Sequence, residues 1–318
     1  MTNRLPSALV IYNPVAGRFP SRLLTERAAA IFQKQGWKIE IETTLSGDHI
    51  ESLSYQAANA NLDALIVVGG DGSINRALPG LVGTRTALGV LPAGTSNVWA
   101  QEFNLPGLSY TRWMALEESA RRLASSKINR VDVGRCDGHY FLLWAGIGLD
   151  AFIVHSIEPR RQWEKHFAFV HYATSVVWKA STWKGIDLEI SSVNGNVYGR
   201  YMLAVVSNIR LYAGGLARIS PNAVLDDGVM DLWLFEGESL EDTLHQAWNL
   251  WLGRHVLSDR VRYIPFQQLS LHSDQTIFLE LDGEPDVGGR QVNIEVIPEA
   301  INILVPQGTS DGLFKHKL

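Results

Sequence analysis

Short apolar runs alternate with helix-like segments along the first third of the chain. Strands are predicted over residues 8–12, 37–43, 64–68 and 86–91, and the runs 8–12 and 64–68 have the composition and length of buried strands. Helices are predicted between them over residues 21–35, 48–61 and 73–81. Regular alternation of strand and helix predicts a parallel sheet with helices on both faces, whose ligands bind at the carboxyl ends of the strands.

The pattern changes after Ile128, where strand-like runs are joined by tight turns. Residues 136–138, Cys-Asp-Gly, have the composition of a hairpin turn. Two helices are expected to interrupt this half, one over residues 162–183 and one that begins at Ser239. At the second helix, Ser239 and Asp242 have the spacing of a capping box. The second half is therefore expected to be mainly β.

The composition excludes several classes of protein. Of the 318 residues, 46% are hydrophobic and 19% charged, which is typical of a globular protein of about two domains. The net charge of −5 argues against a nucleic-acid partner. The single cysteine, Cys136, excludes an intrachain disulfide and a multi-cysteine zinc site and favours a cytoplasmic protein. The longest apolar stretch, residues 140–154, is shorter than the roughly 20 residues of a membrane-spanning helix.

Three glycines within four residues follow the third predicted strand, in the sequence Gly69-Gly70-Asp71-Gly72-Ser73-Ile74-Asn75. Glycine can adopt a positive φ and lets backbone N–H groups approach a phosphate, and the following helix offers its positive dipole end. A carboxylate would repel a bare phosphate, so Asp71 indicates a divalent cation or its water shell. A tight turn with a capping aspartate is the alternative. The position at the ligand-binding edge of the sheet favours a phosphate site.

Two further loops are expected at the same edge. Residues 92–97, Pro-Ala-Gly-Thr-Ser-Asn, place polar side chains at a helix start, where they can bind a ligand or cap the helix. Residues 13–18 form the third loop, in which Arg18 can hold a phosphate. Two glycine-bearing loops after neighbouring strands favour a ligand site over simple capping.

Two acidic turns lie in the second half. Asp282-Gly283 between extended runs is a hairpin signal, but a hairpin does not require Glu284, which could act as a general base. Residues 226–231 contain three acids, which form either an acidic turn between strands or a cation site. Spacing alone favours the purely structural interpretation of both turns.

Other candidate motifs are weaker. No Walker loop is present, and Gly146-Ile-Gly148-Leu-Asp-Ala151 is similar to a dinucleotide-binding fingerprint without the acid-terminated strand that should follow it. Close packing of a strand on a helix is the simpler explanation for these glycines. None of the nine histidines has a zinc-binding spacing, so no zinc site is predicted.

Taken in order, the motifs resemble those of the diacylglycerol kinase-like lipid kinases, which include soluble bacterial diacylglycerol kinases and sphingosine kinases. The resemblance extends from Ala8 to about Val305. It is carried by Tyr12-Asn13-Pro14 with Gly17 and by residues 69–75, 91–97, 146–148, 225–228 and 282–284. Ser73 and Val98 depart from the family pattern, which usually has threonine and commonly has aspartate at these positions.

The resemblance implies two domains. Residues 1–128 would form an α/β nucleotide-binding domain similar to those of NAD kinases and phosphofructokinases, with residues 300–318 returning to it. Residues 129–299 would form a β-rich, sandwich-like domain, with ATP between the two domains.

The resemblance also implies residue roles. ATP would contact Asn13, Val15, Ala16, Gly17, Arg18, Phe19, Thr43, Gly69, Gly70, Asp71, Gly72, Ser73, Ile74, Asn75 and Thr95. Asp71 would be catalytic together with Glu284, the base that takes the proton from a lipid hydroxyl. Asp227, with the carbonyls of Val224 and Val229, would hold a structural Mg²⁺.

The implied acceptor is a lipid at a membrane surface, such as the inner face of the cell membrane. Basic residues 160–166 precede an expected helix that is apolar nearly all round, which suits peripheral contact with an anionic membrane, although a buried core helix is the alternative. A kinase of a soluble acceptor and a silent nucleotide- or lipid-binding protein are the rival functions. The presence of Asp71 and Glu284 argues against the silent protein. The oligomeric state is open, and a homodimer is one possibility.

Overall fold

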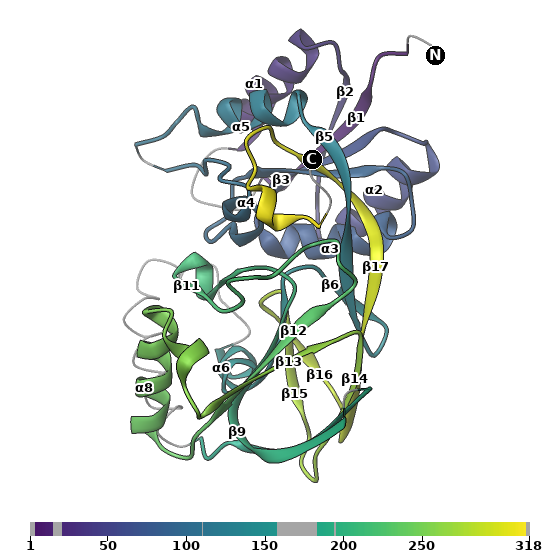
Figure 1. The fold of residues 1–318 in the computed structure, drawn as a ribbon. Coiled ribbons are helices and arrows are strands. Elements are labelled where there is room, and N and C mark those ends of the chain that lie inside the picture. Colours follow the sequence, from purple (N-terminus) through teal and green to yellow (C-terminus); the bar gives the residue numbers. More distant parts are fainter. Residues whose placement is uncertain (1–3, 15–20, 110, 158–182, 194, 316–318) are drawn as a thin grey trace. The chain divides into compact units, whose positions relative to one another are not determined.

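A computed structural model of the chain describes all residues except 1–3, 15–20, 110, 158–182, 194 and 316–318. Its contacts divide the chain into two compact units (Figure 1). The first comprises Met1–Val133, Val224–Gly228 and Ile297–Leu318, and the second comprises Gly134–Ala223 and Val229–Val296. Residues 224–228, which the sequence placed in the second domain, therefore pack with the first unit.

The first unit contains a five-stranded parallel sheet in the order β17–β4–β3–β1–β2. Its strands are β1 (Ser7–Tyr12), β2 (Lys38–Thr43), β3 (Ala64–Gly69), β4 (Ala87–Pro92) and the last part of β17 (Gln291–Val305). Every residue of β3 and β4 is buried, as expected for parallel strands covered on both faces. The predicted α/β fold is confirmed.

Helices pack on this sheet in two groups. The helices are α1 (Ser21–Lys34), α2 (Gly47–Asn59), α3 (Asp71–Leu81), α4 (Val98–Glu102) and α5 (Ala115–Ala124). Helix α1 packs with α5, and α2 packs with α3. The chain moves outward from β1 to β2 and then returns to β3 and β4, so right-handed crossovers place α1 and α2 on opposite faces. The strand order reverses between β1 and β3, which is where ligands bind in sheets of this type.

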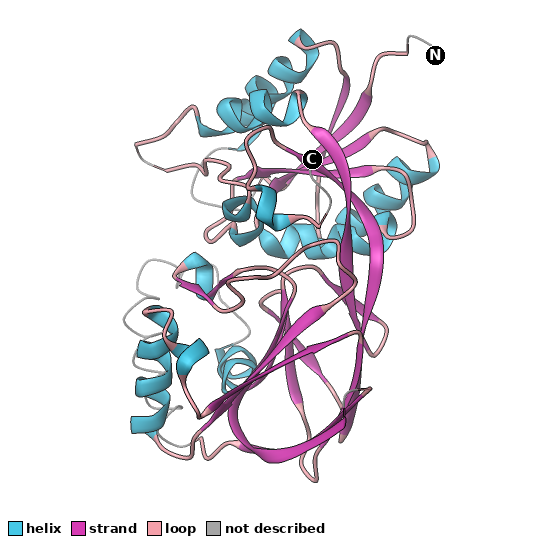
Figure 2. Cartoon of the chain, viewed as in Figure 1, coloured by secondary structure: helices cyan, strands magenta, loops and turns pink. Residues whose placement is uncertain are grey.

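The second unit is built from antiparallel strands (Figure 2). They are β6 (His139–Phe141), β7 (Trp144–Gly148), β8 (Ile186–Ser192), β9 (Gly195–Ser207), β12 (Met230–Glu236), β13 (Val261–Phe266), β14 (Gln268–His272), β15 (Phe278–Leu281) and β16 (Glu284–Val287). The short strands β10 (Leu211–Tyr212) and β11 (Ala217–Arg218) form a separate pair. The unit boundary falls within β17 and within β5 (Lys127–Cys136). A cluster of buried aliphatic and aromatic side chains fills the unit. The strands listed above confirm that the second half is β-rich.

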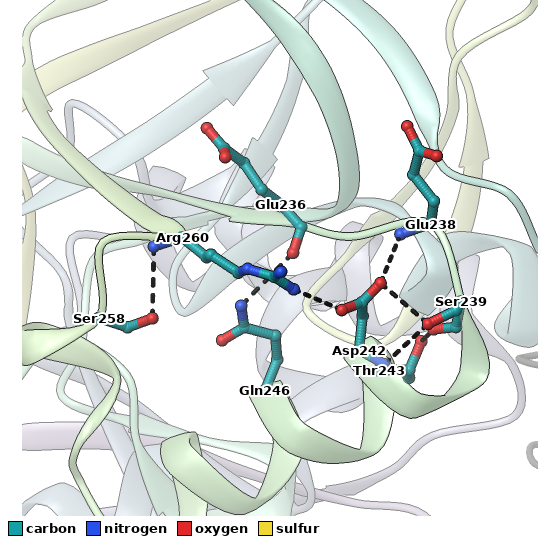
Figure 3. Close-up of polar contacts among 8 residues, drawn as sticks. All are labelled: Glu236, Glu238, Ser239, Asp242, Thr243, Gln246, Ser258 and Arg260. Atoms are coloured by element: carbon teal, nitrogen blue, oxygen red, sulfur yellow. Dashed lines mark hydrogen bonds and ion pairs between the residues drawn. The ribbon is translucent and has the colours of Figure 1, made fainter.

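Helix α8 (Leu240–Trp251) begins at the predicted cap (Figure 3). The Ser239 hydroxyl accepts the N–H of Asp242 at 3.1 Å. The Asp242 carboxylate accepts the N–H of Glu238 at 3.1 Å and pairs with Arg260 at 2.5 Å. These bonds satisfy donors that a helix start would otherwise leave unpaired.

Some predicted elements differ from the structure. Helix α5 begins at Ala115, and Trp113 just before it is 49% exposed. Helix α6 (Leu149–Ile157) follows the Gly146–Gly148 strand and had not been predicted. The helix predicted over residues 162–183 lies almost entirely outside the described residues, as do the basic residues before it. Among the described helices, none has the length and apolar composition needed to cross a bilayer.

Candidate active site

The loops predicted to bind phosphate meet at one edge of the first sheet. Strand pairing sets Tyr12 beside both Thr43 and Val68, and Gly69 beside Pro92. Because these strands are parallel, the segments that follow them emerge at the same edge. The structure therefore brings together Asn13, Thr43, the 69–75 loop and the 92–97 loop. Val15, Ala16, Gly17, Arg18 and Phe19 lie outside the described residues.

The two glycine loops pack backbone against backbone. A Cβ atom added to Gly94 would lie 2.5 Å from the Cα of Gly70 and 2.9 Å from its nitrogen. The N–H of Ala93 donates to the carbonyl of Gly69 at 3.1 Å, which joins the loops at their bases. Neither Gly70, whose φ is −106°, nor Gly94 adopts a positive φ. Glycine is needed at these positions because the two backbones approach too closely for a side chain. The sequence argument from positive φ was therefore wrong for this loop.

Asp71 connects the same two loops. One carboxylate oxygen accepts the N–H of Val98 at 2.9 Å, and the other accepts the N–H of Trp99 at 3.1 Å. Burial raises the pKa of Asp71, and these amide bonds oppose the shift. The carboxylate thus caps α4, the helix that follows the second loop, rather than a turn of its own loop. The interaction of Asp71 with a cation or its water shell stays a prediction.

The second loop is fixed by its own asparagine. Asn97 adopts a left-handed conformation with φ of 53°. Its side chain accepts the N–H of Gly94 at 2.8 Å and donates to the carbonyl of Gly94 at 2.9 Å. Thr95 lies between these anchors and is exposed, so its hydroxyl is available to a ligand.

The remaining residues of the first loop differ in what they offer a ligand. Ser73 and Asn75 are partly exposed, whereas Ile74 is 1% exposed and belongs to the core. Any contact of Ile74 with a nucleotide must therefore come from its backbone. Gly70, Gly72 and Thr43 are partly exposed and Gly69 is buried. Helix α3 begins at Asp71, so its first N–H groups lie in this loop.

Glu284 lies in the second unit, directly after a tight turn between β15 and β16. Asp282 and Gly283 have φ of 53° and 86°, the pattern of the predicted hairpin. The Asp282 carboxylate accepts N–H bonds from Leu142 and Leu143 at 2.8 Å and from Trp144 at 3.1 Å. Asp282 therefore anchors the turn, a role that the hairpin interpretation of the sequence did not include.

The Glu284 carboxylate is partly exposed. Within the described part of the chain, it forms no hydrogen bond or ion pair. A general base needs this property, because a carboxylate that is already paired inside the protein cannot readily accept a substrate proton.

The acidic turn at residues 224–228 packs beside Asp132, a residue the sequence reading missed. Asp132 accepts the N–H of Gly228 at 2.7 Å and the N–H of Glu299 at 2.8 Å. Burial is the main cause that raises the pKa of Asp132 to about 6, and the charges of Asp227 and Asp226 add to it. An acid between the apolar residues Val131 and Val133 was the available signal.

These oxygen donors fit a divalent cation. Bound Mg²⁺ would offset the mutual repulsion that raises the pKa of Asp132, and it prefers oxygen ligands such as Asp227 and backbone carbonyls. Within the described segments, no three His, Cys, Asp or Glu side chains gather as a metal site. The carbonyls of Val224 and Val229 or water would therefore have to complete the coordination.

Comparisons with known proteins agree with this fold. The family described as "Diacylglycerol kinase catalytic domain" matches residues 7–136. A second, described as "YegS C-terminal NAD kinase beta sandwich-like domain", matches residues 145–305, about half of the chain.

Relatives of similar length carry kinase names. A diacylglycerol kinase of Bacillus subtilis (strain 168) is 25% identical over 283 residues, which cover 87% of this chain and 89% of that protein. A Pectobacterium atrosepticum protein named "Probable lipid kinase YegS-like" is 25% identical over 306 residues, which cover 95% of this chain and 96% of that protein. The structure of a diacylglycerol kinase from Bacillus anthracis str. Sterne shares the fold, with a TM-score of 0.72 at 19% identity over 97% of this chain and 100% of that chain. With both halves matched in the expected order, this chain belongs to the diacylglycerol kinase-like family of lipid kinases.

Proposed function

We propose that the protein transfers the γ-phosphoryl group of MgATP to the hydroxyl of a lipid, with diacylglycerol as the first acceptor to test. The observation that carries this proposal is the Asp282-Gly283-Glu284 turn, which holds at a fixed position a carboxylate that pairs with none of the described residues. The names of the relatives from Bacillus subtilis and Pectobacterium atrosepticum favour a lipid acceptor.

Three sets of residues would contribute to the proposed reaction. Phosphoryl transfer requires positioned phosphates, neutralised charge and an acceptor hydroxyl that can lose its proton. Backbone N–H groups of the 69–75 loop and the hydroxyl of Thr95 would hold the phosphates, as helix starts do for anions. Asp71 keeps the two loops together through the amides of Val98 and Trp99. Glu284 would accept the proton from the lipid hydroxyl.

When bound, MgATP would supply the transferred group and a cation to neutralise charge on its phosphates. A second, structural Mg²⁺ would be held by Asp227 with the carbonyls of Val224 and Val229. That ion would stabilise the acidic turn and has no proposed part in the chemistry.

The test is an assay of the purified protein with labelled MgATP. Mixed micelles would present diacylglycerol, monoacylglycerol, ceramide, a sphingoid base or phosphatidylglycerol, one lipid in each reaction. A labelled product in the organic phase supports a lipid kinase and identifies its acceptor class. Bound ATP without product on any lipid, or product only on a soluble acceptor such as NAD, contradicts the proposal.

Glu284→Gln tests the base. The substitution keeps the shape of the side chain and removes its basicity, so we expect turnover to fall about 10²-fold or more while ATP affinity is retained. Glu189→Gln, on the exposed face of β8, is the matched control. Wild-type turnover in Glu284→Gln would remove Glu284 from the mechanism.

A further inference from the structure

Two carboxyl groups meet directly behind the turn that carries Glu284. Glu280, at the third position of β15, is 1% exposed, and one of its oxygens accepts the N–H of Gly283 at 2.6 Å. The Asp150 carboxyl group lies close to the other oxygen of Glu280, and its charge acts on Glu280. The Tyr212 hydroxyl donates to the same Asp150 carboxyl group.

Gly146 makes room for this pair. It lies opposite Glu280 in the pairing of β7 with β15. A Cβ atom at this position would lie 2.5 Å from Oε1 of Glu280 and 3.0 Å from Oδ2 of Asp150. The Gly146–Ala151 motif, explained from sequence by close packing of strand and helix, therefore has a more specific cause. Its glycine accommodates two carboxyl groups, one of which, Asp150, lies in the same motif.

The surroundings of Glu280 disfavour its negative charge. Burial raises the pKa of Glu280 well above its usual value, and the charges of Asp150 and Asp282 raise it further. The Gly283 amide and the Trp144 side chain oppose this shift, as the Tyr212 hydroxyl does for Asp150. In the described part of the chain, no Lys, Arg or His forms an ion pair with either carboxyl group.

We propose that Glu280 positions the catalytic turn by holding the Gly283 amide, so that it is a positioning residue for Glu284. The turn is then fixed at two successive residues. Asp282 binds the amides of Leu142, Leu143 and Trp144, and Glu280 binds the amide of Gly283. Glu284 follows immediately, so the direction of its side chain depends on both anchors. The proposal rests on the proposed role of Glu284 as the base.

Hydrogen exchange at the Gly283 amide tests the anchor without any substrate. Glu280→Ala removes the acceptor, so we expect faster exchange at this amide than in the wild type. Glu280→Gln keeps an oxygen for Gly283 and an N–H group for Asp150, so we expect it to restore protection. Glu189→Ala, on the exposed face of β8, is the control. Unchanged protection in Glu280→Ala overturns the proposal.

Turnover tests the consequence for catalysis, with MgATP and mixed micelles of dioleoylglycerol as the probe. We expect Glu280→Ala to lower kcat about tenfold or more, because a displaced catalytic group costs rate steeply, and to leave the KM for ATP unchanged. Glu280→Gln should restore kcat, which a general loss of folding would not explain. A melting temperature for each variant separates unfolding from misplacement.

The pH dependence gives an independent signature. Because the pKa of Glu280 is raised, its ionisation as pH rises places a second negative charge beside Asp150, and kcat should fall. Glu280→Gln removes this ionisable group, so this alkaline fall should be absent. The same alkaline fall in Glu280→Gln and the wild type contradicts the part assigned to ionisation of Glu280.

The failure of this proposal is distinguishable from failure of the proposed function. If the wild type does not phosphorylate dioleoylglycerol, the assigned acceptor is wrong. If Glu284→Gln keeps full turnover, the assigned base is wrong. In either case, hydrogen exchange at the Gly283 amide still decides whether Glu280 holds the turn. If Glu284→Gln is inactive while Glu280→Ala keeps wild-type turnover, the positioning role alone is wrong.

Discussion

Gly94 has little room for a side chain, and this dictates what its substitution should do. A Cβ atom would lie 2.5 Å from Cα of Gly70 and 2.9 Å from the Asn97 side chain. Gly94→Ala should therefore separate the two loops, weaken ATP binding and cost about 1–3 kcal/mol of stability. Calorimetric ATP titration and thermal unfolding measure both effects. Gly289→Ala, where a Cβ meets nothing closer than 4.0 Å, is the control, and equal tolerance of both substitutions would contradict the packing argument.

His255 should make stability depend on pH. Its ring is 0% exposed, its Nε2 bonds to the carbonyl of Ile219 at 2.8 Å, and burial lowers its pKa. Because the folded pKa lies below the unfolded value, the contribution is complete above about pH 6.5 and is lost as pH falls below it. Melting temperature should therefore drop more between pH 7 and 5 in the wild type than in His255→Gln. The exposed His272→Gln is the control, and identical slopes in all three proteins would contradict the assignment.

The roles of residues that bind a distant segment, or whose direction depends on strand register, could not be predicted from the sequence. The Gly69–Asn75 loop was found because its glycines and its helix start are adjacent along the chain. Asp132 acts on a segment far away along the chain, through the amide of Glu299, and Glu280 acts through the amide of Gly283. For Glu280 the partner is only three residues away, yet its direction depends on the strand register that sets it opposite Gly146.

Elements with a strong local signal were predicted well. The buried strands β1, β3 and β4 are short apolar runs bounded by glycine or proline, so their ends are set by the sequence itself. Helix α6 was missed because its first residues, 149–154, end the apolar run that starts at residue 140 and includes β7. Within such a run, hydrophobicity alone does not distinguish a buried strand from a buried helix.

The start of α8 should contribute measurably to stability. Ser239→Ala removes one cap bond and should cost about 1 kcal/mol. Asp242→Ala removes bonds to Glu238 and Ser239 and the ion pair with Arg260, so it should cost more. Glu238→Ala is the control, because Glu238 contributes its backbone N–H. Urea denaturation measures the three values, and an Asp242→Ala cost no larger than that of Glu238→Ala would contradict the role of the cap.

At the scale of the whole chain, the order of the folded units is not the order of the sequence. The first unit takes Val224–Gly228 from the middle of the β-rich half and Ile297–Leu318 from the end. The N–H of Leu225 donates to the carbonyl of Leu313 at 2.9 Å, which joins these two segments. Local periodicity cannot reveal such a return, and the expected return of residues 300–318 came from the resemblance alone. The acidic turn 224–228 therefore bears on the stability of the first unit.

Magnesium should raise the melting temperature of the protein through this turn. The charges of Asp226 and Asp227 contribute to the raised pKa of Asp132, so the acidic group is less stable without a cation. An ion that binds only the native state stabilises it by about 2.7 kcal/mol at a hundred times its Kd. We expect thermal unfolding in MgCl₂ to occur at a higher temperature than in EDTA at matched ionic strength. Asp227→Asn should abolish this difference, whereas the exposed Asp259→Asn should retain it. Equal melting temperatures of the wild type in both buffers would contradict a cation site at the turn.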